Sequence, residues 1–524
     1  WEDLHWADPS TLDTLTLFLD QVPTARLLVL LTFRPDFTPP WGSRSYLSQL
    51  TLSRLGRPQV EAMVEHITGG KHLPREVRQQ IVAKTDGVPL FVEELTKMVL
   101  ESGLLREEQG RYVGAHGDAP LPPLAIPSTL QDSLMARLDR LAATREIAQL
   151  GATLGREFSY ELIHATSPLD EGTLQQGLRQ LVEAELVYQR GLPPQATYLF
   201  KHALVQDTAY QSLLKSRRQQ LHQQIAQVLE ERFAEIRETQ PELLAHHYTE
   251  AGLLAQAIPY WQQAGQQAVQ RSANAEAISH LTRGLELLKT LPDTPERTQQ
   301  ELALQIALGA PVMITTGYGS PEVEKVYSRA RELCGLIGET PQLFRVLWGL
   351  WTLYLTRGDC RIARDLGEQL LRLARNTQDP ASLLEAHVAF GITLVFFGEL
   401  TAARTHLEQG ITLYDPQQHG SLALYGQDPG AAGLSWAALA LWLLGYPEQA
   451  LQRMREALAL ARELTHPPSL AYVLCQAAVF HQLRREGQVA RERAEETISL
   501  ALEQGFALRC ISPLRFLCPI FRRS

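Results

Sequence analysis

Apolar residues recur every three to four positions along most of this chain, and that period predicts helices. From about residue 240 onward, a glycine turn, a small residue and an amphipathic stretch recur together as one unit. The turns contain Gly252, Gly358, Gly398, Gly445 and Gly487, and the last four are 40 to 47 residues apart. Helical hairpins at this period form an α-solenoid of tetratricopeptide type with slightly long repeats. We therefore expect such repeats over residues 239–509.

Two kinds of residue in the repeats predict how the helices pack. A small residue follows each of four turns, at Ala257, Ala363, Ala403 and Ala450. These positions should let paired helices approach closely. The aromatic residues Trp348, Trp351 and Tyr354 lie at helical spacing, which predicts a place in the solenoid core. The alternative is that they line a concave peptide groove.

The first 105 residues mix strand and helix patterns. The apolar run LLVLLTF (27–33) predicts a buried parallel strand that ends at Arg34-Pro35, because proline cannot continue a central ladder. Before it, Asp8-Pro9-Ser10 predicts a helix start. The helix would carry one apolar face, made of Leu12, Leu15, Phe18 and Leu19. This order predicts one crossover of a doubly wound α/β sheet. Residues 58–105 predict two or three short helices, with turns at 69–70 and 85–89.

The middle of the chain predicts a small helical module. A Gly- and Pro-rich stretch at 110–127 predicts a linker. After it, STLQDSLMARLDRL and LQQGLRQLVEAELV have the helical period. The segments ELVYQRG and TYLFKH flank the turn LPPQA, which predicts two short antiparallel strands. Helices followed by a hairpin are the layout of a winged helix, expected here over 128–238.

Composition and charge argue against several classes of function. The net charge of −9 gives no general electrostatic help in binding nucleic acid or anionic lipid, and the best short basic stretch, KSRR at 215–218, predicts a solvated helix face. Five cysteines without a C-x-x-C pair predict neither a disulfide framework nor a zinc site. The pair His246-His247 has no carboxylate or cysteine at ligand spacing, so a structural role is expected. Direct DNA binding and membrane association are not expected.

Three features could carry nucleotide chemistry. Glu2 and Asp3 are adjacent carboxylates, the hard oxygen ligands that Mg²⁺ prefers. Arg34 follows the predicted strand, where a guanidinium could reach a γ-phosphate. Gly87-Val88-Pro89 forms a tight turn before a helix, where backbone and proline ring could contact an adenine base. Each feature alone also fits an ordinary turn, a strand-end cation or a plain helix start.

Together these stretches resemble a known family. EDLHWADPSTLDTL, LLVLLTFRPDF and DGVPLFVEEL are similar to the signal-transduction ATPases with numerous domains (STAND), a branch of the AAA-like NTPases. More narrowly, the chain resembles bacterial predicted ATPases fused to class III adenylate/guanylate cyclase or LuxR-type output domains. The repeat phrases GYGSPEVEKVYSRARELCG and LSWAALALWLLGYPEQALQRMREALALA resemble the same group. The resemblance covers nearly the whole chain, except about the last 15 residues.

The resemblance implies roles for single residues. The acid pair matches the Walker B motif, which implies Mg²⁺ binding by Glu2 and a catalytic or water-positioning role for Asp3. Arg34 matches the sensor arginine, and Gly87 and Pro89 match a nucleotide-contacting turn. The implied cofactors are ATP and Mg²⁺. The winged helix would relay nucleotide state to the repeats, which would bind an inducer or a protein partner.

One departure from the family limits these expectations. The motif G-x-x-x-x-G-K-[ST] is nowhere in the 524 residues, although the family carries it upstream of Walker B. We therefore expect a fragment that begins within a motif, with ATP and Mg²⁺ bound only when the upstream part is present, and with no activity of its own. The alternative is a non-catalytic tetratricopeptide scaffold with an inactive nucleotide site. A cytoplasmic location is expected.

The predicted fold class is mainly α, with three parts in succession. A remnant of an α/β P-loop NTPase sheet occupies 1–57 and a helical lid with the G-x-P turn occupies 58–109. After the linker at 110–127 come the winged-helix-like module at 128–238 and the α-solenoid at 239–509. Residues 510–524 lose the helical period and predict an irregular tail.

Overall fold

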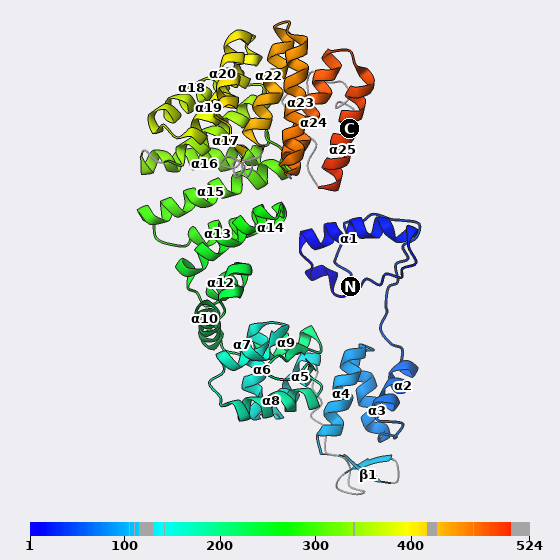
Figure 1. Cartoon of the computed structure of the whole chain (residues 1–524). Helices are drawn as coiled ribbons and strands as arrows, with labels where there is room; N and C mark the ends of the chain where they lie inside the picture. The colour runs from blue at the N-terminus through cyan, green and yellow to red at the C-terminus, as the bar shows by residue number, and fades with distance from the viewer. Residues whose placement is uncertain are drawn as a thin grey trace. The chain divides into compact units, whose positions relative to one another are not determined.

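The computed structural model describes residues 1–103, 105–108, 111–114, 129–140, 142–338, 341–416, 427–464 and 466–504. Most of them are helical, as the sequence predicts, and two small antiparallel sheets complete the secondary structure of this part (Figure 1). The chain divides into two compact units. Unit 1 holds Trp1–Trp41, Gln240–Ala245 and the residues from Leu254 onward, and unit 2 holds Gly42–Thr239 and His246–Leu253. The predicted tail at 510–524 lies outside the described residues.

The chain begins with a short helical segment in unit 1. It comprises the 3-10 turn η1 (Leu4–Trp6), helix α1 (Pro9–Gln21) and the 3-10 turn η2 (Val22–Thr24). The predicted helix start is confirmed, because the Asp8 carboxylate caps α1 by accepting the Thr11 backbone N–H at 2.8 Å. Leu15 and Leu19, on the predicted apolar face, are buried.

The predicted buried strand at 27–33 is wrong. Residues 27–34 have no regular secondary structure, and Leu28 and Leu30 are 86% and 71% exposed. The beginning of the chain nevertheless lies parallel to this segment, since the Trp1 amino group donates to the Leu30 carbonyl at 2.9 Å and the Thr32 N–H donates to the Trp1 carbonyl at 3.0 Å. A central parallel strand is covered on both faces. Within the described residues this segment lacks that cover, so its leucines stay exposed.

Unit 2 begins with a helical layer that confirms the predicted short helices. It contains α2 (Arg57–Ile67), α3 (Arg75–Thr85) and α4 (Pro89–Glu101). Gly70, after α2, and Gly87, before α4, adopt positive φ at the two predicted turns. The three helices enclose a core that contains Val60, Val77, Ile81, Val92 and Leu95.

A hairpin that the sequence analysis missed follows α4. Strands β1 (Leu105–Glu108) and β2 (Arg111–Gly114) pair antiparallel, with Arg106 opposite Val113. Strand β2 therefore occupies the start of the range predicted as a linker, and residues 115–127 of that range lie outside the described residues. Closely spaced charged residues in LREEQGRY (105–112) hide the strand pattern, because only Leu105 is buried on β1.

The next module contains the predicted helices and hairpin. Its helices are α5 (Leu130–Arg140), α6 (Ala142–Leu154), α7 (Tyr160–Thr166), α8 (Glu171–Glu183), α9 (Ala203–Gln211) and α10 (Lys215–Arg232). The predicted hairpin is confirmed as β4 (Val187–Arg190) and β5 (Thr197–Phe200), which pair antiparallel. A third strand, β3 (Glu157–Ser159), pairs with β5 and gives the order β3-β5-β4. Three residues were too few for the sequence pattern to reveal β3.

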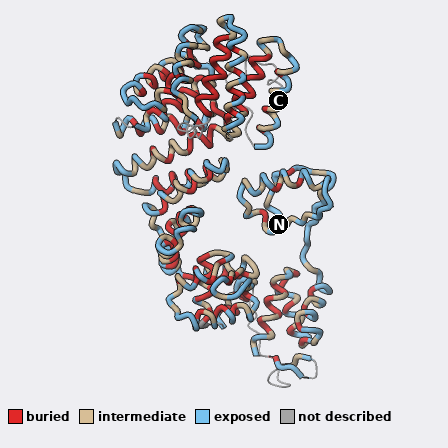
Figure 2. The backbone as a smooth tube through the Cα atoms, in the orientation of Figure 1, coloured by how far each residue is buried: buried red, intermediate tan, exposed pale blue. Residues whose placement is uncertain are grey.

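Helices α11 (Ala234–Thr239) and α12 (Pro241–Glu250) lead to a series of antiparallel helix pairs. The pairs are α13 (Leu254–Gln270) with α14 (Asn274–Leu288), α15 (Pro295–Thr316) with α16 (Pro321–Ile337), α17 (Leu343–Arg357) with α18 (Cys360–Thr377), α19 (Pro380–Phe396) with α20 (Leu400–Leu413), α22 (Pro429–Leu443) with α23 (Pro447–Glu463), and α24 (Pro467–Leu483) with α25 (Gly487–Glu503). Each pair packs on the next, as the predicted repeats require. The buried residues lie where helices face one another (Figure 2).

The turns between paired helices follow the predicted pattern with one correction. Gly358, Gly398 and Gly445 have positive φ two residues before the next helix begins. In the last pair that place belongs to Arg485, at φ 64°, while Gly487 is the first residue of α25. Each turn therefore requires a residue with positive φ at this position, and glycine is the residue that most often fills it.

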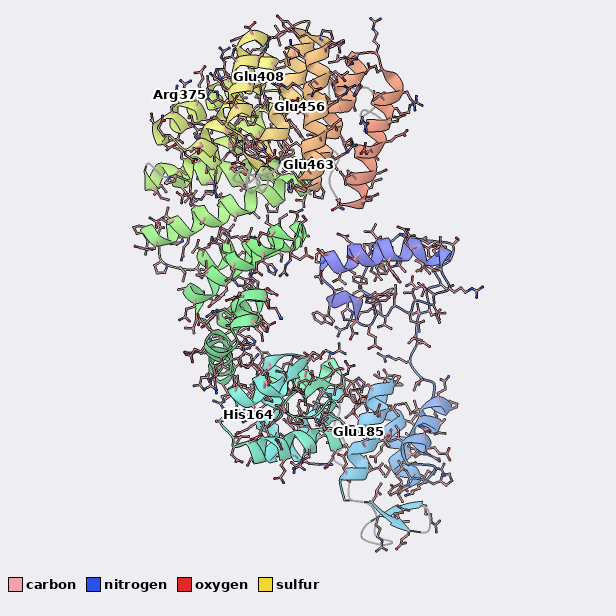
Figure 3. The ribbon with its side chains drawn as sticks, viewed as in Figure 1. His164, Glu185, Arg375, Glu408, Glu456 and Glu463 are labelled. Atoms are coloured by element: carbon pink, nitrogen blue, oxygen red, sulfur yellow. The ribbon has the colours of Figure 1, made fainter. Side chains whose placement is uncertain are left out.

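The four small residues and two of the three aromatic residues pack as predicted, whereas Tyr354 is only half-buried. All four small residues are fully buried, namely Ala257, Ala363, Ala403 and Ala450. Trp348 and Trp351 are buried in the core, and the Trp351 indole donates to the Thr393 hydroxyl at 2.8 Å. An ion pair also joins neighbouring helix pairs, because Arg453 of α23 binds Glu408 of α20 at 2.8 Å. Arg453 binds Glu456 of its own helix at 2.8 Å as well. Figure 3 labels Glu408 and Glu456 among the side chains of the repeats.

Candidate functional site

The acid pair and the predicted sensor arginine lie in the same segment of unit 1. Asp3 has φ 56° at the start of η1, and its backbone N–H donates to the Thr32 hydroxyl at 3.0 Å. Glu2 is exposed and Asp3 is half-buried. Arg34 is exposed, with its guanidinium 5.8 Å from the centre of the Trp6 ring. The pairing of the first residues with 30–32 thus brings the acids near the segment that carries Arg34.

The chemistry of Glu2 and Asp3 fits a partial magnesium site. Mg²⁺ is commonly held by one or two carboxylates, with phosphate oxygens and water completing its six ligands. Within the described ranges, no group of three or more His, Cys, Asp or Glu side chains is placed to hold a metal ion. The two carboxylates therefore fit Mg²⁺ only together with ligands that a nucleotide and water would supply.

The predicted nucleotide-contacting turn is built around a close backbone approach. Gly87 has φ 70°, and its carbonyl accepts the Leu55 N–H at 2.8 Å. A Cβ at Gly87 would lie 2.2 Å from the Leu55 carbonyl oxygen. Pro89 is the first residue of α4, where its missing N–H costs no helical hydrogen bond. Glycine is therefore required here by the Leu55 backbone, whereas the sequence analysis had assigned that approach to a base.

The predicted site residues are divided between the two units. Glu2, Asp3 and Arg34 belong to unit 1, and Gly87 and Pro89 belong to unit 2.

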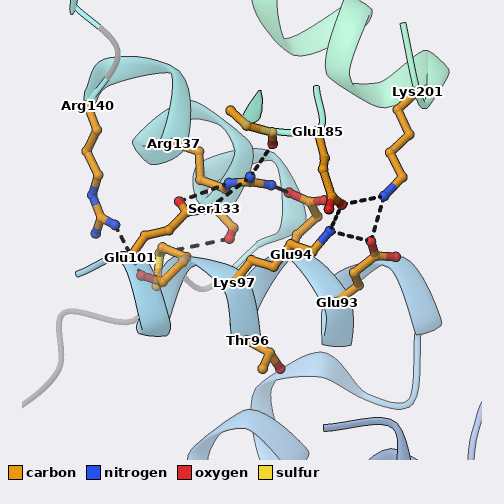
Figure 4. A network of polar contacts seen from close by, with 12 residues as sticks. Glu93, Glu94, Thr96, Lys97, Glu101, Ser133, Arg137, Arg140, Glu185 and Lys201 are labelled. Carbon is orange, nitrogen blue, oxygen red and sulfur yellow. Dashed lines mark hydrogen bonds and ion pairs between the residues drawn. The ribbon is translucent and has the colours of Figure 1, made fainter. Parts of the chain in front are cut away.

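Helix α4, which begins at this turn, has two buried faces. Its apolar face, with Val92, Leu95 and Val99, packs into the core with α2 and α3. Its other face carries Glu93, Glu94, Lys97 and Glu101, and meets the module formed by α5–α10 (Figure 4). An isolated amphipathic helix would turn such a charged face to water. Here the charged face is an internal contact of unit 2.

Arg137 of α5 is the centre of one half of this contact. Its side chain is only 2% exposed, and one Nη donates to Glu94, which is equally buried. The other Nη donates to Glu101 at 3.1 Å and to the Ala184 carbonyl at 2.7 Å. Burial disfavours the Arg137 cation, but the carboxylates of Glu94 and Glu101 raise its pKa above the ordinary value. All three guanidinium nitrogens of Arg137 donate to an acceptor, which is the condition under which a buried cation is tolerated.

A second cluster joins α4 to the β-hairpin side of the module. Glu93 accepts hydrogen bonds from Lys97 and Lys201, both at 2.8 Å. Glu185, in the turn before β4, binds the same two lysines. Burial opposes ionisation of Glu93, but the hydrogen bonds from Lys201 and Lys97 outweigh it and hold its pKa at about 2. Two carboxylates and two ammonium groups thus neutralise one another across the contact.

These ion pairs connect the Gly87–Pro89 turn mechanically to the module. A displacement of α4 has to move Arg137 and Lys201 with it, or leave buried charges unpaired. The sequence analysis did not find this network. The sequence does show a helix with charged residues on one side and an apolar stripe on the other; the charged residues are Glu93, Glu94, Lys97 and Glu101. Their partners could not be identified, because they lie 36 to 108 residues away in the sequence.

His222, His246 and His247 form a second polar cluster in unit 2. The Nδ1 atoms of His222 and His247 lie 2.8 Å apart, and the Tyr210 hydroxyl lies 2.9 Å from His222 Nε2. The His246 ring contacts the His222 ring edge-on. Burial, with smaller contributions from His246 and Arg218, lowers the pKa of His222 to about 4, and burial also places the pKa of His247 well below its usual range. His247 is 1% exposed, so it lies in the core of unit 2 and not on its surface.

The histidine cluster predicts a pH-dependent stability. In the unfolded chain His222 titrates near pH 6.5, so between pH 6.5 and about 4 the unfolded state binds more protons than the folded state. The free energy of unfolding should therefore fall as the pH is lowered through this window. Urea denaturation at pH 7, 6 and 5 should show a smaller loss for His222→Gln than for the wild type. The exposed His164→Gln variant should keep the wild-type loss, and an unchanged loss in His222→Gln would contradict the assignment.

Comparisons with known proteins give limited information. No family model matches the chain. The chain is 25% identical over 488 residues to an uncharacterised protein of Rhizobium meliloti (strain 1021), a match that covers 91% of the chain and 46% of that relative. The chain therefore spans about half the length of this relative. Among the helices of the described residues, none is long and apolar enough to cross a membrane.

One solved structure is similar to the chain at low level. It is a Signal Transduction ATPase with Numerous Domains (STAND) protein with a tetratricopeptide repeat sensor from Pyrococcus horikoshii. The identity is 12%, the TM-score is 0.33, and the match covers 91% of this chain and 70% of that one. A TM-score at this level does not establish a shared fold.

Proposed function

We propose that this chain acts in signal transduction as a nucleotide-dependent switch of the STAND type, coupled to helical repeats that bind a protein partner or an inducer. The observation that carries the proposal is helix α4. It begins at the Gly87–Pro89 turn and is bound to the module by the buried pair of Arg137 and Glu94. A ligand that moves the turn would move the module with it, and a switch requires an element that transmits such a movement.

The proposed roles of the site residues follow the family resemblance. Glu2 would bind Mg²⁺, Asp3 would orient water, and Arg34 would contact the γ-phosphate of ATP. Gly87 and Pro89 would contact the nucleotide at the turn. The donor chemistry of the acid pair supports the metal role. The module would be a winged helix, and the reduced, buried thiol of Cys334 fits a reducing, cytoplasmic location. Any output domain belongs to a longer protein.

Binding of a fluorescent N-methylanthraniloyl derivative of ATP tests the switch, measured on the chain joined to an upstream segment that carries the G-x-x-x-x-G-K-[ST] motif. Binding should require Mg²⁺, and Arg34→Ala should weaken it roughly tenfold, the effect of losing a hydrogen bond between charged groups. Arg26→Ala, which removes an exposed arginine from the same segment, should leave the affinity unchanged. Absence of binding by the wild-type chain when it is joined to that upstream segment, or equal loss in both variants, would contradict the nucleotide assignment.

A second candidate is a non-catalytic scaffold whose repeats bind a partner without nucleotide. The close approach of Gly87 to the Leu55 backbone favours it, because the glycine then has a packing reason without any base. The exposed leucines at 28 and 30 favour it too, because a nucleotide-binding sheet is normally covered. The scaffold predicts no effect of Mg²⁺ and ATP on the chain.

A further inference from the structure

A cavity in unit 2 lies within the module formed by α5–α10. Its volume is about 240 Å³. Three segments form its walls, namely α6, the turn between α7 and α8, and the segment that runs from Leu213 into α10. Cavities that hold drug-sized ligands usually measure roughly 300–1,000 Å³, so this cavity fits a smaller molecule.

Most of the cavity lining is apolar. Six of the ten lining residues carry apolar side chains. Four of the six are between 1% and 7% exposed and so belong to the core of the module: Ile147, Leu150, Leu213 and Leu221. A ligand therefore gains binding free energy from an aliphatic part that covers these side chains.

The charged part of the lining consists of one acid and one base. Glu146 lies on α6 and Arg217 lies on α10, and both side chains are exposed. Neither forms an ion pair with any residue that the structure describes. Within the same residues, the Arg217 guanidinium makes one hydrogen bond, to Gln220, which is long at 3.4 Å. One carboxylate and one guanidinium at the same cavity are thus both able to bind a ligand.

We propose that this cavity binds a free α-amino acid with an aliphatic side chain. The Arg217 guanidinium would bind the α-carboxylate through two parallel hydrogen bonds, and the Glu146 carboxylate would bind the ammonium group. The apolar lining would cover the aliphatic side chain. A ligand that carries only one charge would leave either Glu146 or Arg217 without a partner, and a purely apolar ligand would leave both. Gln149 and Ser167 supply further hydrogen-bonding groups in the lining.

Isothermal titration calorimetry of the whole chain with L-leucine tests the proposal. Leucine should bind with a dissociation constant below about 0.1 mM. Glycine should bind at least roughly tenfold more weakly, because it has no side chain to cover the apolar lining.

Two analogues of leucine test the two charged contacts separately. The first, 4-methylpentanoate, lacks the ammonium group, and the second, 3-methylbutylamine, lacks the carboxylate. The wild-type chain should bind leucine roughly tenfold more tightly than either analogue, the effect of one hydrogen-bonded charge pair. In Arg217→Ala, leucine and 3-methylbutylamine should bind equally, because the carboxylate has lost its partner. In Glu146→Ala, leucine and 4-methylpentanoate should bind equally, because the ammonium group has lost its partner.

Two control variants remove exposed charges of the same unit that do not line the cavity. Glu183→Ala and Arg190→Ala should keep the wild-type affinity for leucine and its preference over both analogues. The proposal is overturned if leucine does not bind in the millimolar range, or if either analogue binds the wild type as tightly as leucine. It is also overturned if Arg217→Ala still prefers leucine to 3-methylbutylamine. The nucleotide proposal stands or falls separately, because its test involves different residues and no amino acid.

Discussion

Replacing Arg137 by alanine should destabilise unit 2 by roughly 3–5 kcal/mol, the usual cost of leaving a buried charge without its partner. Glu94 would keep a carboxylate that is 1% exposed and has lost its cation, and the Ala184 carbonyl would lose its donor. Urea denaturation followed by circular dichroism, with hydrogen exchange of peptides from α4 and α5, would measure the loss. All eight tryptophans lie in unit 1, so tryptophan fluorescence alone would not follow this unit.

Two further variants separate loss of the charge pair from loss of packing. Arg140→Ala removes an exposed arginine from the same helix, whose one hydrogen-bond acceptor among the described residues is the Met98 carbonyl. This variant should cost less than about 1 kcal/mol. Glu94→Met combined with Arg137→Met removes both charges and should recover most of the stability lost in Arg137→Ala. If the double variant were as unstable as the single one, the unpaired Glu94 charge could not be the cause.

Replacing Gly87 by alanine should destabilise unit 2 by roughly 2–5 kcal/mol, because a positive φ and a backbone clash act at the same position. The new Cβ would meet the Leu55 carbonyl oxygen at 2.2 Å and the Leu55 nitrogen at 3.0 Å, and backbone atoms cannot move aside cheaply. The hydrogen bond from Leu55 to the Gly87 carbonyl would be strained as well. Thermal and urea unfolding of the variant would measure the effect.

Gly70 provides a matched control for this substitution. It has φ 79° in the same unit, but no atom lies within 4 Å of a Cβ placed there. Gly70→Ala should therefore lower the free energy of unfolding by only roughly 1–2 kcal/mol, the cost of placing a non-glycine residue in the left-handed region. Equal losses in Gly70→Ala and Gly87→Ala would show that the Leu55 approach contributes nothing.

The repeats could be predicted because the residues that define each helical hairpin are close together in the sequence. A buried alanine such as Ala363 or Ala403 follows its turn by five residues, and the helical period of each copy supports the others. The turn at Arg485 shows the limit of this reasoning. The backbone of Arg485 adopts a positive φ, as that of Gly445 does, but an arginine in the sequence does not indicate such a conformation. The turn was therefore predicted at Gly487, two positions too late.

The segment at 27–33 and the α4 contact could not be predicted in the same way. LLVLLTF has the composition of a buried strand, yet burial depends on covering elements, and the sequence of the strand itself does not say whether they are present. Glu94 and Arg137 are 43 residues apart, and nothing in either neighbourhood identifies the other as its partner. Gly87 was correctly identified as a tight turn, but its partner, the Leu55 backbone, has no signature in side-chain chemistry.

The central claim is that nucleotide state at the Gly87–Pro89 turn reaches the module through α4. The most direct test is hydrogen exchange with and without Mg²⁺ and ATP, on the chain joined to an upstream segment that carries the G-x-x-x-x-G-K-[ST] motif. It compares the wild type with Lys97→Ala combined with Lys201→Ala. The exposed Lys215→Ala variant serves as control. In the wild type and the control, ATP should slow hydrogen exchange at the start of α4 and at the β4–β5 hairpin. In the double variant, ATP should still slow exchange at the start of α4 but no longer at the hairpin. No change at α4 in any of the proteins, or an identical hairpin response in the double variant, would contradict the account.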